Sequence, residues 1–138
     1  TTKYLDASAT AGGLGTGSSN GWRVLRYADV LLVYAEALNE LGYGNPAAFA
    51  ALNQVRGRAG LPALDAAALP GQEAFREKVY AERRVELAFE NHRWFDLLRT
   101  GRAQTLLAAK GAQPRYLLLP IPQRERDLNP NLTQNEGY

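Results

Sequence analysis

The chain has 138 residues, with 16 lysines and arginines against 14 aspartates and glutamates, and its formal net charge is +2. Because this nearly balanced charge is interspersed along the chain, it argues against a nucleic-acid or anionic-membrane surface as the main purpose of the protein. The sequence contains no cysteine, which excludes disulfide frameworks, thiolate zinc sites and cysteine nucleophiles.

Glycine dominates the first segment of the chain, recurring through residues 12–21. Glycine loses much backbone entropy when it is ordered, so this stretch does not favour a regular element. We therefore expect a glycine-rich loop over residues 1–21. A phosphate-binding loop is not expected, because the segment has neither a preceding strand nor a GxGxxG or GK[ST] pattern.

Two helices are expected next. An apolar stripe at three- and four-residue spacing predicts a helix over residues 23–41, stopped by Gly42. A second helix is predicted from Asn45 as N-cap and Pro46 at N1 to about residue 59, ended by Gly60. The first stripe consists of Leu25, Ala28, Leu31, Leu32, Ala35 and Leu38.

These two helices are joined by only about four residues, so they are expected to be antiparallel neighbours. Their faces are rich in alanine, which lets helices approach closely and is typical of a tetratricopeptide-like unit. A single copy is visible, whereas repeat arrays of this kind need about three.

The second half predicts a loop over residues 61–71 and a long helix over residues 72–91. A further helical stretch over residues 92–100 continues that helix or kinks from it, and residues 105–110 are expected to form a short helix. Prolines at 114, 120 and 122 favour an extended segment. The predicted fold is therefore all-α: a tetratricopeptide-like helical hairpin packed against a long helix, with an irregular proline-rich C-terminal tail.

The long predicted helix carries a column of carboxylates. Glu82, Glu86 and Glu90 recur every four residues, in line with the apolar Phe75 and Val79, so the column extends an inward-facing stripe. Buried carboxylates need cations, and arginine suits bidentate pairing with them. We expect an internal arginine–glutamate network that fixes geometry more than stability, because desolvation offsets most of the Coulomb attraction. Its expected arginines are Arg26, Arg83, Arg93 and Arg99, with Arg56 and Arg58 nearby on the hairpin.

Catalytic interpretations of the same residues are weaker. A glycosidase needs two carboxylates facing each other across a cleft, which one helix column does not provide. A di-iron bundle needs Glu-x-x-His on two helices, and the only histidine, His92, lies two residues after Glu90. His92 also lacks a hydroxyl pattern for a nucleophile triad, and is expected to be a hydrogen-bonded packing residue. We therefore predict no catalytic residue, no metal site and no cofactor.

The two tryptophans have different surroundings. Trp94 and Phe95 lie in a strongly apolar helical stretch and are expected in the core. Trp22 lies between the glycine-rich loop and the first helix. Its expected role is a hydrophobic staple on that helix. It is also a candidate for contact with a glycan, because sugar rings present CH faces that stack on aromatic rings, and Tyr4, Tyr43 and Tyr116 are weaker candidates of the same kind.

Five segments resemble the SusD/RagB family, in the family's order. Residues 26–40 resemble its RYADVLLMYAEALNE segment, and residues 53–61 resemble its NxVRxRAGL helix end. Residues 82–99 resemble its ERRxELAFEGxRWFDLxR segment, with Asn91 in place of the usual glycine. Residues 119–123 resemble its LPIP motif, and residues 129–138 its NPNLTQNPGY ending, with Glu136 in place of proline.

The resemblance implies a fold and a function. Family members are longer outer-membrane lipoproteins with tetratricopeptide-like helical pairs. They bind glycans or other nutrients at the cell surface, cap a TonB-dependent transporter and have no catalytic centre. Residues 22–138 would form the C-terminal helical domain, acting mainly as scaffold and transporter contact. The glycan or other nutrient would be bound mostly through an N-terminal half that this chain does not contain, and no family binding residue maps onto this chain.

The remaining expectations concern the ends of the chain and two alternative functions. The chain begins Thr1-Thr2 and contains no methionine, so we expect a piece of a longer protein, whose uncovered helix face would drive self-association. The first alternative is a free-standing tetratricopeptide-like adaptor, which predicts a concave groove with exposed asparagine and arginine. The second is a glycan-active enzyme, which predicts a cleft with two carboxylates of separated pKa.

Overall fold

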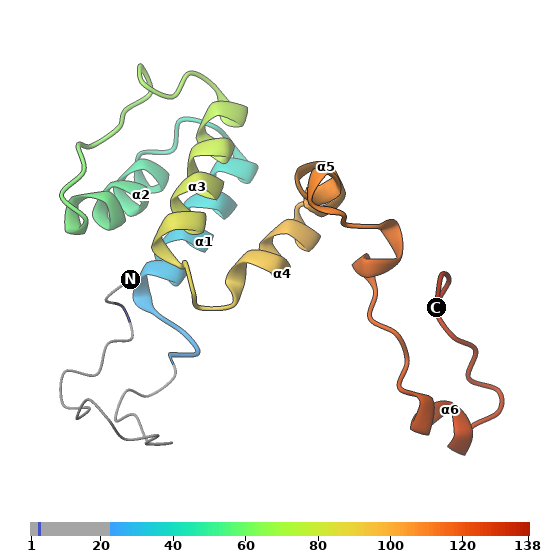
Figure 1. Cartoon of the computed structure of the whole chain (residues 1–138). Coiled ribbons are helices and arrows are strands. Elements are labelled where there is room, and N and C mark those ends of the chain that lie inside the picture. Colours follow the sequence, from blue (N-terminus) through green and yellow to red (C-terminus); the bar gives the residue numbers. More distant parts are fainter. Residues whose placement is uncertain (1–2, 4–22) are drawn as a thin grey trace, which may run out of the picture. The chain divides into compact units, whose positions relative to one another are not determined.

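The computed structural model describes residue 3 and residues 23–138, so the expected glycine-rich loop and Trp22 lie outside the described residues. Every regular element among the described residues is a helix, which confirms the all-α prediction (Figure 1). The chain divides into two compact units at Glu86 and Leu87. We call the first the three-helix unit and the second the C-terminal unit.

The helices fall into the two units in chain order. The three-helix unit contains α1 (Tyr27–Leu41), α2 (Pro46–Arg58) and α3 (Gln72–Glu86). The C-terminal unit contains α4 (His92–Arg99), α5 (Ala103–Leu107), η1 (Ala108–Lys110), η2 (Pro114–Leu117) and α6 (Gln123–Leu128), where η marks a 3₁₀ helix. None of the helices within the described part is both long enough and apolar enough to cross a bilayer.

Helices α1 and α2 form the predicted hairpin. The Asn45 side chain accepts a hydrogen bond from the backbone N–H of Ala47 at 2.9 Å, and Pro46 occupies the first helical position. An N-cap of this kind stabilises a helix by about 1 kcal/mol. The small side chains of Ala35 and Ala48 are buried where the helices meet, which allows their close approach.

The core of the three-helix unit forms where α3 packs against the hairpin. Leu32, Leu52, Phe75 and Val79 are almost completely buried. The rings of Phe49 and Phe75 meet edge to face, with centroids 4.8 Å apart and planes inclined by 69°. Because edge-to-face pairs have a preferred geometry, they orient α3 as well as adding buried area. The predicted packing of the hairpin against a further helix is therefore confirmed.

The predicted long helix is shorter than expected. It ends at Glu86 instead of residue 91, and α4 is a separate helix. The physical reason is the backbone at Phe89 and Asn91, which adopt φ of 66° and 63°. A left-handed conformation cannot continue a right-handed helix. Glu90 therefore does not belong to the helical column of Glu82 and Glu86, and that part of the prediction is wrong.

The helix α4 also differs from expectation in what it buries. Leu97 and Asp96 are buried, Trp94 is half-buried and Phe95 is 65% exposed. In a helix of only two turns, Phe95 lies on a different side from Leu97, because successive residues are separated by about 100°. The expectation that Trp94 and Phe95 both lie in a core is therefore wrong for Phe95.

The C-terminal tail is closed by side chains that bond to backbone groups. Gln134 accepts from the Ile121 N–H at 2.8 Å and donates to the Ile121 carbonyl at 3.0 Å. The Tyr138 hydroxyl donates to the carbonyls of Arg115 and Leu118. These bonds tie the last residues to the proline-containing segment. That segment begins with the short helix η2, because Pro114 is compatible with a first helical position, and it becomes extended from Leu118.

The side of α1 that faces away from the core is apolar as well. Val30, Val33 and Tyr34 are 45–50% exposed, and Tyr27 and Leu41 are more exposed still. A helix that is apolar all round is normally covered on both sides. Two copies of this chain could cover the face of α1 by pairing it with itself, as in two-fold symmetric dimers.

We expect Val33→Glu to weaken self-association of the chain by at least tenfold, because the carboxylate would have to be desolvated between two α1 faces. Sedimentation velocity over a range of concentrations measures the effect. The matched control is Val85→Glu on α3, a residue that is 74% exposed and lies outside this face. A wild-type chain that remains monomeric at every concentration would contradict the prediction.

Candidate functional site

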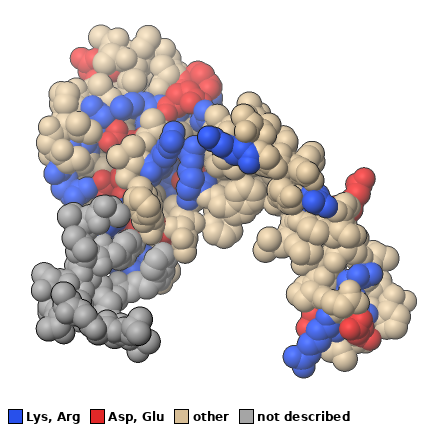
Figure 2. Space-filling model, in the orientation of Figure 1, with Lys and Arg blue, Asp and Glu red and all other residues tan. Residues whose placement is uncertain are grey.

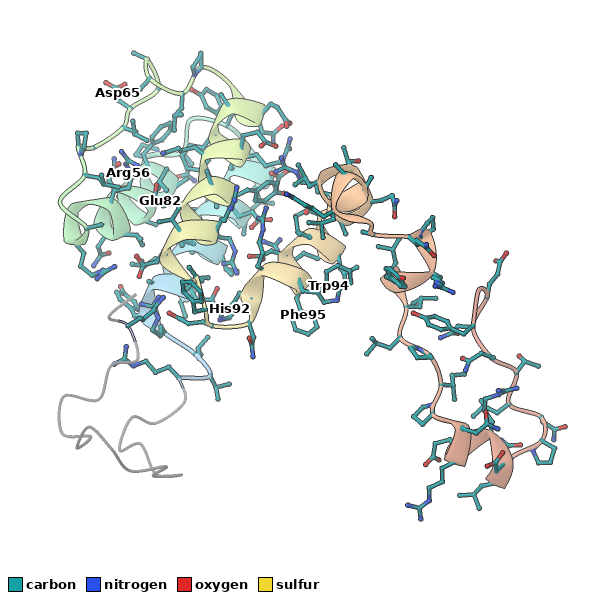
Figure 3. The ribbon with its side chains drawn as sticks, in the orientation of Figure 1. Arg56, Asp65, Glu82, His92, Trp94 and Phe95 are labelled. Atoms are coloured by element: carbon teal, nitrogen blue, oxygen red, sulfur yellow. The ribbon has the colours of Figure 1, made fainter. Side chains whose placement is uncertain are left out.

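Glu82 is buried between α2 and α3 together with Arg56. Arg56 Nη1 donates to Glu82 Oε2 at 2.8 Å, and the two side chains are only 6% and 8% exposed. The Arg56 Nε donates to the carbonyl of Pro62 at 3.0 Å, and Lys78 Nζ lies 3.5 Å from Glu82 Oε2. Figure 3 shows Arg56 and Glu82 pointing toward one another. A single guanidinium thus joins α2, α3 and the loop between them.

Glu86 receives cations at both its side chain and its backbone. Arg26 donates to Glu86 Oε1 and to the Glu86 carbonyl, each at 2.9 Å, and Arg58 donates to Glu86 Oε2 at 2.5 Å. Lys3 Nζ donates to the same carbonyl at 2.8 Å. Glu86 is the last residue of α3, where the unpaired carbonyls carry partial negative charge. The three cations therefore cap the C-terminus of α3 and neutralise its last carboxylate.

Arg83 pairs with an aspartate that was not among the expected partners. Its Nη1 donates to Asp29 Oδ1 at 2.7 Å, and both side chains are nearly inaccessible. Asp29 lies in the first turn of α1, one position after Ala28 and three before Leu32, on the side that faces the core. An acid on an otherwise apolar inner face was the available signal for this contact.

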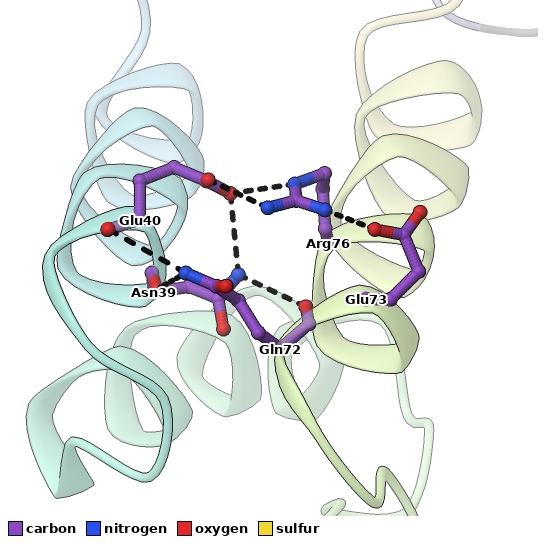
Figure 4. A network of polar contacts seen from close by, with 5 residues as sticks. All are labelled: Asn39, Glu40, Gln72, Glu73 and Arg76. Carbon is purple, nitrogen blue, oxygen red and sulfur yellow. Dashed lines mark hydrogen bonds and ion pairs between the residues drawn. The ribbon is translucent and has the colours of Figure 1, made fainter.

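A further set of polar contacts joins the C-terminal end of α1 to the N-terminal end of α3 (Figure 4). The Gln72 side chain donates to the Asn39 carbonyl at 2.6 Å, and the Asn39 side chain donates to the Gln72 carbonyl at 3.1 Å. Arg76 donates from Nε and Nη2 to the two oxygens of Glu40, each at 2.7 Å, and also bonds Glu73. None of these contacts was expected from the sequence.

These bonds change the acidity of the two main partners. The hydrogen bond from Arg76 is the main cause that lowers the pKa of Glu40 below its usual 4.5, while desolvation opposes it in part. The same bond with Glu40 raises the pKa of Arg76. Both shifts favour the charged forms, so the pair stays ionised over the whole physiological range.

The remaining residues of the expected network lie in the C-terminal unit. Arg99 Nε donates to Asp96 Oδ1 at 2.9 Å, Glu90 is 4% exposed, and Arg93 is half-buried beside the half-buried His92. The residues expected to form one network therefore belong to two different units of the chain. Glu82 and Glu86 contact arginines of the hairpin and the segment before it, as described above.

Both acids of the expected column that belong to α3 contact cations. Glu82 contacts Arg56 and Lys78, and Glu86 contacts Arg26 and Arg58. No group of three histidine, aspartate or glutamate side chains suited to a metal ion occurs within residues 23–138. Over the three-helix unit, basic and acidic side chains lie next to one another (Figure 2). Such alternation fits ion pairing and does not form a surface of one sign.

A hollow of about 520 Å³ lies between α1 and α2. Arginine side chains and apolar groups line it together, namely Arg23, Arg26, Arg58, Tyr27, Leu31 and Val55. Two of these arginines already contact Glu86. The hollow therefore offers an apolar floor with a partly neutralised basic rim.

Comparison with known proteins identifies the family. The model of the SusD family matches residues 1–116. The chain belongs to the SusD family. A curated relative, SusD-like protein P2 of Formosa agariphila, is 36% identical over 149 aligned positions, which cover 99% of this chain and 30% of the relative. The chain therefore spans less than a third of that relative's length.

Solved SusD structures resemble the fold. A laminarin-binding SusD-like protein has a TM-score of 0.65 and 39% identity, covering 83% of this chain and 23% of its own. The surface glycan-binding protein A from Bacteroides thetaiotaomicron has a TM-score of 0.69 and 33% identity, covering 85% of this chain and 25% of its own. The resemblance inferred from the sequence motifs is thus confirmed, as is the helical fold.

Because the Arg56–Glu82 pair of this SusD-family chain is buried, we expect substitutions of two arginines of α2 to have unequal effects on stability. We expect Arg56→Met to lower the free energy of unfolding by about 3 kcal/mol, because it leaves the buried Glu82 carboxylate with Lys78 alone. The matched control is Arg58→Met, two residues further on, whose side chain is 64% exposed. It should cost about 1 kcal/mol or less.

Urea denaturation of both variants measures the difference. The double variant Arg56→Met with Glu82→Leu should recover part of the loss, because it removes the unpaired charge as well. Equal losses for Arg56→Met and Arg58→Met would contradict the assignment of Arg56 as the buried partner.

The Glu40–Arg76 pair predicts a pH-dependent contribution to stability. Since the folded pKa of Glu40 is lowered, its contribution is fully present above the unfolded pKa and is lost as the pH falls through the folded pKa. Glu40→Gln should therefore destabilise the chain near neutral pH by about 1 kcal/mol or less, because the carboxylate is 43% exposed. The difference from wild type should vanish in acid.

Denaturation curves at several pH values test this expectation, with Glu73→Gln as the control. Glu73 bonds the same guanidinium but is 71% exposed and makes one contact with it. A Glu40→Gln penalty that stays constant from neutral to acidic pH would show that the charge of Glu40 is not its source.

Proposed function

We propose that this chain serves a glycan-uptake system as a non-catalytic binding and scaffold module. The observation that carries the proposal is membership of the SusD family, together with two solved relatives whose names describe them as laminarin-binding and glycan-binding. The pairing of Glu82 and Glu86 with arginines supports the absence of catalysis. Carboxylates held by cations on one helix do not offer the separate acid and base that sugar hydrolysis needs.

The proposal includes a location and a protein partner. We place the chain at the outer-membrane surface, in a protein held there by a lipid anchor, beside a TonB-dependent transporter. The motifs of residues 26–40 and 82–99 support this placement through their resemblance to the family. In that setting residues 22–138 act mainly as scaffold and as a contact region for the transporter. No step of the proposed role requires a cofactor or a nucleic acid.

A peptide-binding adaptor remains a second candidate. The hollow between α1 and α2 supports it, because arginines around an apolar floor can hold an extended segment with acidic side chains. The single helical hairpin provides less groove than the arrays of at least three repeats that such adaptors use. Glycan binding is therefore the function that the observations favour.

Affinity electrophoresis of the whole 138-residue chain tests the proposed function. Gels that contain laminarin, or one of a panel of other soluble polysaccharides, should retard the chain relative to a non-binding protein of similar mass. Incubation with the retarding glycan should release no new reducing ends. Normal migration in every gel would contradict glycan binding by this chain, and an increase in reducing ends would contradict the non-catalytic role.

A further inference from the structure

Three aromatic side chains gather around residues 87–95, which comprise the turn after α3 and the first residues of α4. Phe89 is 68% exposed, Phe95 is 65% exposed and Trp94 is half-buried. They line one hollow of about 410 Å³, together with Leu87, Asn91 and Arg93. Figure 3 shows Trp94 and Phe95 projecting from α4 on the same side of the ribbon. All six lining residues belong to the C-terminal unit, so the hollow is a feature of that unit alone.

The backbone holds Phe89 at this hollow at an energetic cost. A φ of 66° is uncommon for any residue with a side chain and is an outlier for a bulky one, costing about 1–3 kcal/mol. The cost is not offset by burial, because most of the ring remains in contact with water. The second left-handed residue, Asn91, lies in the same turn and also lines the hollow. Strained residues that display a side chain in this way are concentrated at binding sites.

The composition of the hollow indicates its ligand. Sites for small molecules measure roughly 300–1,000 Å³ and combine apolar or aromatic walls with a few polar groups. Aromatic rings offer flat apolar faces, and a pyranose ring offers a matching face of C–H groups. At the rim, the Asn91 amide can both donate to and accept from sugar hydroxyls, and the Arg93 guanidinium can donate. No carboxylate lines the hollow, so there is no acid–base pair for cleavage.

We propose that Phe89, Trp94 and Phe95 form a stacking site for one pyranose unit of a glycan. The inference rests on the proposed function and adds the place of contact and the class of sugar. It differs from the expectation drawn from the sequence, in which Trp22 was the main candidate for glycan contact and Trp94 and Phe95 were core residues. The site binds the sugar ring by its face, and the polar rim fixes its orientation.

Tryptophan fluorescence tests the site, because the chain has only two tryptophans. Addition of laminarin should change the emission of the wild-type chain. The change should persist in Trp22→Phe and disappear in Trp94→Phe. A response that disappears in Trp22→Phe and persists in Trp94→Phe would assign the contact to Trp22 and overturn the proposal.

Affinity measurements provide the second readout. Phe95→Ala should weaken laminarin binding about tenfold, which corresponds to about 1.4 kcal/mol. Because Phe95 is mostly exposed, circular dichroism should show an unchanged fold. The matched control is Tyr34→Ala, an aromatic residue of α1 that is 49% exposed and lies outside the hollow. It should leave the affinity unchanged.

The outcomes separate the two proposals. If the chain binds laminarin and neither Trp94 emission nor the Phe95→Ala affinity responds, the stacking site is wrong and the proposed function stands. If laminarin does not retard the chain and another glycan of the panel does, the same variants are tested with that glycan, with the same two outcomes. If no glycan of the panel is bound, both proposals fail.

Discussion

Pairing between guanidinium groups and carboxylates determines how α3 sits on the hairpin. Apolar contacts through Phe75 and Val79 supply burial, and the edge-to-face contact of Phe75 with Phe49 helps to orient α3, but apolar contacts alone tolerate small shifts of a helix. The pairs Arg56–Glu82 and Arg83–Asp29 do not, because each is nearly inaccessible and its geometry is fixed by directed hydrogen bonds. An incorrectly docked α3 would leave charges buried without partners, which costs several kcal/mol. These contacts therefore specify one arrangement more than they stabilise it.

The same contacts pair the buried Glu82 and Asp29 carboxylates with guanidinium groups. This ion pairing and membership of the SusD family both support the binding role proposed above. Exposed apolar groups occur on the outer side of α1 and, within the C-terminal unit, around the aromatic hollow.

Local patterns in the sequence were sufficient to predict most of the helices, but they were not sufficient to predict the contacts between helices. Asn45, Pro46 and Gly42 mark the hairpin because caps and breakers act on neighbouring residues. The partner of Arg83 lies 54 positions away and that of Arg76 lies 36 positions away, so no short spacing reveals them. The end of α3 was missed for another reason. Residues 87–90 are compatible with a helix, and a phenylalanine rarely adopts a left-handed backbone, so nothing in the composition marked Phe89, whereas Asn91 adopts this conformation more readily.

The side-chain hydrogen bonds that hold the C-terminal tail affect how another chain could pair with it. The Gln134 amide satisfies both backbone groups of Ile121, as a neighbouring strand would, but it belongs to a side chain. An extended segment held by a strand would continue the ladder and present a second row of free N–H and C=O groups. Here single side chains take that place, because Tyr138 and Asn135 bond the carbonyls of Leu118 and Leu119 in the same stretch. A foreign strand that paired with these backbone groups would first have to displace the side chains that already bond them.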